Sequence, residues 1–112
     1  MTDDEQREVV INIRLDFSRW PGGRTQKDGS FSGEAFREKH LIRPLEKGRT
    51  VRVIFDDDYG YGSSFLEEAF GGLVRSHGLD SNFVLDRLII EANDKTIAVA
   101  IKNYVNDASV DN

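Results

Sequence analysis

The chain has 112 residues, of which 38% are hydrophobic and 31% charged, and its formal net charge is −5. This length and composition indicate one ordinary globular domain that can fold without a disulfide or a metal. The lack of cysteine excludes disulfides, thiolate zinc sites and cysteine nucleophiles. The acidic balance argues against a nucleic-acid binder, although the basic residues between Arg37 and Arg52 could form a local patch.

The two ends of the chain are polar. Residues 1–8 are acidic and lack the basic start and apolar core of a signal peptide. No apolar run approaches the roughly 18–20 residues that span a bilayer. We therefore expect a cytoplasmic protein with no membrane contact. Its domain is expected over residues 9–105, between a disordered N-terminal tail at 1–8 and a C-terminal tail at 106–112.

The first predicted element is a strand over residues 9–15, where apolar and other residues alternate with a period of two. The Pro-Gly-Gly sequence at 21–23 breaks the chain into a turn. Residues 24–31 are then expected to form a short second strand that closes a hairpin.

A helix follows, with Ser32 as its cap and an apolar face that reaches Leu41. Pro44 either ends this helix or begins another short turn, and Gly48 stops it. The compact apolar run at 51–55 predicts a buried central strand of an α/β sheet.

The strongest predicted helix begins near Ser64. Ser64 and Glu67 form a capping-box pattern at its start. Two adjacent glycines, Gly71 and Gly72, lie inside it and indicate the close approach of another backbone, from this domain or from a partner. Its apolar stripe must face the sheet and consists of Phe65, Leu66, Ala69, Phe70, Leu73 and Val74.

The last third of the chain predicts a short helix at 81–87, a buried strand at 88–90 and a final helix capped by Asp94. Residues 97–101 also alternate, which leaves a strand there as the alternative. Strands alternating with helices indicate a single compact α/β domain, with helices packed against its sheet.

The run from Gly60 to Val74, Gly-Tyr-Gly-Ser-Ser-Phe-Leu-Glu-Glu-Ala-Phe-Gly-Gly-Leu-Val, resembles the signature of the bacterial STAS-like domain family of unknown function. The Gly23-Arg24 pair, residues 32–37 and residues 43–45 (Arg-Pro-Leu) are also similar to that family. The resemblance covers most of residues 9–104 and implies a STAS-like fold with a mixed sheet.

The resemblance also implies a function. STAS domains, typified by anti-sigma factor antagonists, bind a kinase-like partner through the loop before this helix, and phosphorylation of a serine at the helix start releases that partner. Ser63 and Ser64 occupy the matching position. Because a capping role already explains Ser64, Ser63 is the stronger candidate for phosphorylation. The expected partner-binding residues are Tyr59, Tyr61, Ser63 and Phe65, and tyrosines beside glycines make good interface anchors.

Three consecutive aspartates, Asp56 to Asp58, follow the predicted central strand. Acidic groups at the carboxyl end of a strand can bind Mg²⁺, so Asp56 and Asp58 are weak metal candidates, with a solvated loop as the simpler interpretation. His40 and His77 lie on different predicted helices and form no metal-binding motif. We expect no cofactor.

The preferred prediction is a non-enzymatic regulatory module that binds another protein, a kinase-like ATPase or an anti-sigma-like regulator. One alternative is a Mg²⁺-dependent phosphoryl-transfer enzyme built on Asp56–Asp58. The other is an assembly subunit in which the helix after Ser63 packs in a homo-oligomer.

Overall fold

The computed structural model describes residues 8–55 and 61–110. Within them, three strands form one parallel sheet in the order β1-β2-β3, with bounds Val9–Asn12, Val51–Phe55 and Leu88–Ala92. Parallel neighbours need long crossovers, and here the connections are helical. The single α/β domain is thus confirmed. The expected mixed sheet is corrected to a parallel one as far as the described strands go.

The first crossover contains a helix of three consecutive segments: α2 (Gly33–Phe36), the π-helical η3 (Arg37–Leu41) and α3 (Ile42–Glu46). Ser32 caps it as predicted, because its Oγ accepts a hydrogen bond of 3.2 Å from the Ala35 N–H. Contrary to both expectations for Pro44, the helix passes through this residue. Just before the proline, the Ile42 N–H donates to the Arg37 carbonyl in a π-type turn, so the regular α-helical pattern is already interrupted there. Gly48, at φ +77°, follows the helix end.

The hairpin strand expected at 24–31 is wrong. A short 3-10 helix, η2 (Gln26–Asp28), lies there instead. The reason is local turn chemistry: the Asp28 carboxylate accepts hydrogen bonds from the backbone N–H groups of Arg24 and Thr25, at 3.1 and 3.0 Å. Gly23 at φ +87° completes a compact loop, which pairs with none of the three described strands.

The first strand is also shorter than its alternation predicts. It ends at Asn12, whose side-chain oxygen accepts from the Leu15 N–H at 3.1 Å and opens the π-helical turn η1 (Ile13–Phe17). Ile13 is fully buried, but Leu15 is 75% exposed and contributes little to the core. A side-chain cap has therefore replaced the last part of the strand.

The second crossover contains α4 (Ser63–Leu66), the π-helical η4 (Glu67–Gly71) and α5 (Gly72–Arg75), followed by α6 (Ser81–Arg87). The predicted stripe is confirmed, because all six of its residues are buried. The strand predicted at 88–90 is β3, but as an edge strand it is only half-buried.

The final element, α7 (Lys95–Val110), is a helix, so the alternative strand at 97–101 is wrong. Asp94 caps it by accepting from the Thr96 N–H at 2.9 Å. The helix extends past the expected domain end at residue 105, and Ala108 is buried. Glu8, assigned to the N-terminal tail, forms an ion pair with Arg52 at 3.0 Å. The domain therefore extends beyond 9–105 at both ends.

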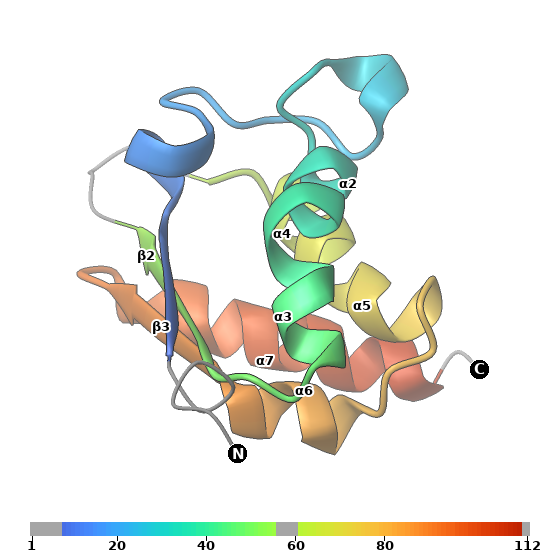
Figure 1. Cartoon of the computed structure of the whole chain (residues 1–112). Helices are drawn as coiled ribbons and strands as arrows, with labels where there is room; N and C mark the ends of the chain where they lie inside the picture. The colour runs from blue at the N-terminus through green and yellow to red at the C-terminus, as the bar shows by residue number, and fades with distance from the viewer. Residues whose placement is uncertain (1–7, 56–60, 111–112) are drawn as a thin grey trace.

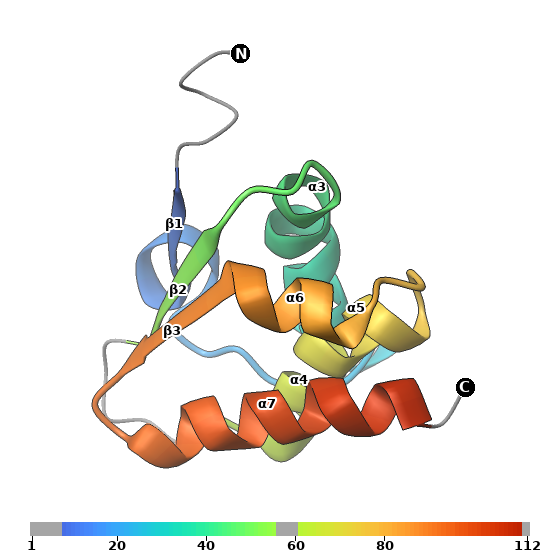
Figure 2. The ribbon, with the colours of Figure 1, turned by 90° about the horizontal axis from the view of Figure 1, so that it is seen from below.

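Helices α3 to α7 lie on the same side of the sheet (Figures 1 and 2). The core lies between them and the inward residues of the strands, including Ile11, Val53 and Phe55. On the other face, Arg52 on the central strand pairs with Glu8 and with Glu91. Among the described helices, none combines the length and apolar character that crossing a bilayer requires.

Candidate functional site

The loop–helix junction is the start of the helix that runs from Ser63 to Arg75. Gly62 is its N-cap residue, and the Gly62 carbonyl accepts from the Leu66 N–H at 3.1 Å. Ser63 and Ser64 form the first turn and are both exposed. Neither hydroxyl is hydrogen-bonded to another residue within 8–55 and 61–110. The junction therefore presents two accessible hydroxyls at the positive end of a long helix.

The capping box predicted for Ser64 and Glu67 is wrong. Ser64 lies inside the helix, one residue past its start, so its side chain cannot occupy the capping position. Glu67 points elsewhere: it pairs with Arg24 and, at 2.6 Å, with Arg75. Burial raises the pKa of Glu67, but the hydrogen bonds from Arg75 and Arg24 outweigh it and lower the pKa overall. Ser64 therefore has no more of a capping role than Ser63.

The aromatic residues assigned to partner binding do not form a surface patch. Phe65 is fully buried beside Phe36, with ring centroids 5.8 Å apart, so its assignment as a partner contact is wrong. Tyr61 is half-buried and packs edge-on against Phe55 at 4.8 Å. Tyr59 lies outside the described residues. Of the predicted contacts that the structure describes, Ser63 is the one that is exposed to solvent.

The acidic metal candidates Asp56 and Asp58, with Asp57 between them, also lie outside the described residues. In the part of the chain that the structure describes, no three His, Asp or Glu side chains are grouped so that they could hold a metal ion. His77 lies 2.6 Å from Glu38, and His40 packs against the ring of Phe17. The two histidines do not come together.

A buried arginine joins the two long helices behind the junction. Arg37 donates to the Glu68 carbonyl at 2.7 Å and to the Glu68 carboxylate at 2.8 Å, and its side chain is 5% exposed. A Cβ at Gly72 would lie 2.9 Å from the Arg37 Cζ, so the glycine makes room for the guanidinium. At Gly71 a Cβ would lie 3.3 Å from the Tyr104 carbonyl of α7. The close backbone approach expected at these glycines is thus found at Gly71, from within the domain, whereas the close neighbour of Gly72 is a side chain.

We predict that Arg37→Ala lowers the free energy of unfolding by about 3 kcal/mol, because it removes one partner from a buried ion pair. Arg75→Ala is the matched control. Its side chain is 34% exposed and pairs with Glu67 and with Glu68, the second of which it shares with Arg37, so its removal should cost less than about 1 kcal/mol. Urea denaturation measures both. Equal losses for the two variants would contradict the structural role of Arg37.

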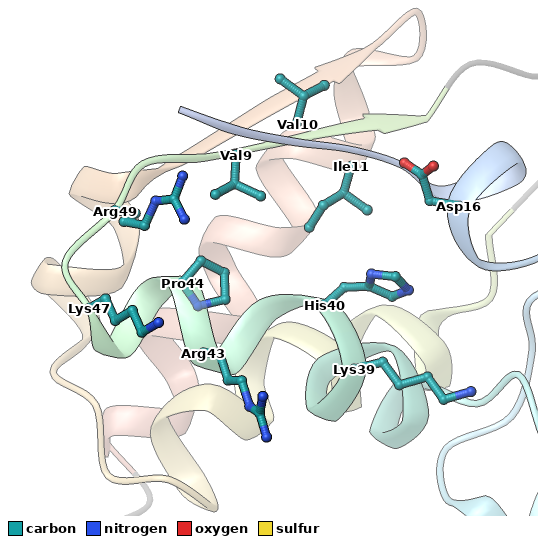
Figure 3. Close-up of a pocket in the computed structure, with 10 residues that line it drawn as sticks. All are labelled: Val9, Val10, Ile11, Asp16, Lys39, His40, Arg43, Pro44, Lys47 and Arg49. Carbon is teal, nitrogen blue, oxygen red and sulfur yellow. The ribbon is translucent and has the colours of Figure 1, made fainter. Parts of the chain in front are cut away.

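A second feature is a basic groove of about 520 Å³ between β1 and the helix α2–η3–α3 (Figure 3). Val9 and Ile11 extend from β1 toward Pro44 and His40 on the helix. Burial lowers the pKa of His40, which favours the neutral form of its ring. The remaining lining residues are Val10, Asp16, Lys39, Arg43, Lys47 and Arg49. The sequence showed these basic residues but not that they gather beside a strand.

The family model of a STAS-like domain of unknown function matches residues 32–98. This span begins at the Ser32 cap and contains the loop–helix junction and both later strands. No curated protein and no solved structure matches the chain.

Proposed function

Since this chain belongs to the family of STAS-like domains of unknown function, we propose that it is a non-enzymatic regulatory module whose protein partner binds at the loop–helix junction. The observation that carries the proposal is the exposure of Ser63 and Ser64 in the first turn of a helix whose apolar face is packed into the core. A rigid helix holds such a surface in one geometry, which favours specific recognition.

The same position suits a phosphorylation switch. A phosphate on Ser63 would meet the free N–H groups and positive dipole end of the helix, so the fold would tolerate it. The nearby acidic side chains Glu67 and Glu68 are already paired with arginines, which reduces their repulsion of an added anion. A partner surface that is apolar or acidic would tolerate the same charge poorly.

Photo-crosslinking tests where the partner binds. A photoreactive amino acid at position 63 should capture a specific protein from the native host, whereas the same group at Ser30, an exposed loop residue, should not. The captured protein is then purified and its affinity measured. Size-exclusion with mass measurement separates this result from self-association of the chain.

We predict that Ser63→Asp weakens binding of that partner at least about tenfold while leaving the melting temperature nearly unchanged, because a carboxylate is favourable in a first helical turn. Ser63→Ala should bind normally, and Ser30→Asp controls for added negative charge elsewhere. Isothermal titration measures all three. Wild-type affinity for Ser63→Asp would count against the junction as the binding surface and leave the assembly subunit as the better explanation.

A further inference from the structure

The basic groove has an unbalanced charge. Lys39 in η3, Arg43 in α3 and Lys47, the cap residue after α3, follow one another at four-residue spacing along the outer rim of the groove, whereas His40 and Pro44 face β1 (Figure 3). None of the three forms an ion pair with any acid among residues 8–55 and 61–110, and one acidic residue, Asp16, lies in the lining. In a chain with a formal net charge of −5, this is a local site of attraction for anionic groups.

The groove lies beside a strand edge that can accept another strand. β1 pairs with β2 on one side and has no described strand on the other. The Val9 N–H donates to the Thr50 carbonyl at 2.8 Å, so Val9 faces β2. Because successive backbone groups of a strand alternate in direction, the N–H and C=O of Val10 face outward. Val10 is 52% exposed.

We propose that an extended acidic segment of a partner protein adds to the free edge of β1 and places its acidic side chains in the basic groove. Every second residue of a strand lies on the same face, about 6.6–6.8 Å apart. Residues four apart on a helix are separated by about 6 Å along its axis. Alternate acidic side chains of the added strand therefore match the row Lys39, Arg43 and Lys47, while backbone hydrogen bonds to Val10 provide affinity.

The arrangement favours a peptide over other anions. The three cations are spread over about 12 Å of helix instead of converging on one point, as a site for a single phosphate requires. A nucleic acid would extend beyond the groove and meet a protein whose overall charge repels it. This binding surface is separate from the loop–helix junction, so the inference does not depend on the proposed function.

The probe is a short fluorescein-labelled peptide in which glutamate or aspartate alternates with valine. Fluorescence anisotropy should show saturable binding, and the backbone amide signals of Val9–Ile11 should shift in NMR spectra of the ¹⁵N-labelled full chain. Arg43→Glu combined with Lys47→Glu should weaken binding at least about tenfold. Lys95→Glu combined with Lys102→Glu makes the same charge change on exposed positions of α7 and should leave affinity within about twofold.

Val10→Pro tests the backbone pairing, because it removes the outward N–H but no ladder bond to β2. This variant should abolish peptide binding. If it does not fold, the peptide-induced amide shifts at Val9–Ile11 of the wild-type chain show whether the peptide binds at the edge of β1. The inference is overturned if the peptide does not bind, if Val10→Pro binds normally, or if the control charge pair weakens binding equally. Tighter binding of a single-stranded oligonucleotide, or displacement of the peptide by millimolar inorganic phosphate, would also overturn it. Ser63→Asp should leave peptide affinity unchanged.

Discussion

Gly33→Ala is expected to destabilise the domain by about 3 kcal/mol or more, which is enough to prevent folding of a marginally stable chain. Gly33 is buried where α2 crosses the helix after the junction. A Cβ there would overlap the Phe65 carbonyl oxygen and lie 3.0 Å from the Ala69 nitrogen. Both are backbone atoms of a helix, so the overlap can be relieved only if the two helices move apart.

Gly62→Ala is the matched control for this variant. Gly62 has an ordinary φ of −64°, and no atom lies within 4 Å of an added Cβ. Its stability should fall by no more than about 1 kcal/mol, the cost of alanine at an N-cap position. Urea denaturation of both variants, followed by circular dichroism, gives the comparison. A midpoint for Gly33→Ala close to that of the wild type would show that the helix crossing is wider than described.

Phe70→Asp is expected to prevent folding altogether, and Leu66→Asp should have the same effect. Phe70 is fully buried between the rings of Phe36 and Phe55, at centroid distances of 6.3 and 6.5 Å. A carboxylate there would be unpaired in an apolar surrounding, which costs several kcal/mol or forces the group to take up a proton. Far-ultraviolet circular dichroism and thermal melting measure the loss.

Ser64→Asp adds the same charge to the same helix. Ser64 is exposed in the first turn, where the helix dipole favours an anion, so this variant should be at least as stable as the wild type. Cooperative melting of Phe70→Asp near the wild-type temperature would mean that the buried face of the helix is assigned wrongly.

Much of the fold could be predicted because local patterns and tertiary contacts agree over most of the chain. The apolar run at 51–55 and the stripe after Ser64 are periodic, and each buries the face that its period indicates. The caps at Ser32 and Asp94 act within two or three residues of themselves, so a local pattern was sufficient.

The errors occur where a local signal competes with a contact from elsewhere. The capping-box pattern of Ser64 and Glu67 failed because Glu67 is held by Arg24, a residue 43 positions away. A pattern of four neighbouring residues carries no information about an arginine so far away in the sequence. The strand expected at 24–31 failed for the opposite reason, since the Asp28 carboxylate binds nearby N–H groups more directly than a distant strand could.

The candidate sites also differ in whether local sequence or tertiary structure determines them. The exposure of Ser63 follows from its place at a helix start, and the burial of Phe65 follows from its place in the apolar stripe. A role of Phe65 in partner binding conflicts with the apolar stripe, which predicts that this residue faces inward. The basic groove could not be predicted from the sequence. It depends on which face of the helix lies beside β1, and this is set by the tertiary packing.

The parallel sheet has a consequence for how fast the chain folds. Val9 pairs with Val51 and Val51 with Leu88, so each strand pairing closes a loop of about forty residues. A helix forms within about a microsecond, but closing such loops costs chain entropy before the new contacts compensate for it. We therefore expect these two closures to set the rate of folding. Substitutions where the crossover helices contact each other, at Gly33 or Phe70, should slow folding more than substitutions on the open face of the sheet.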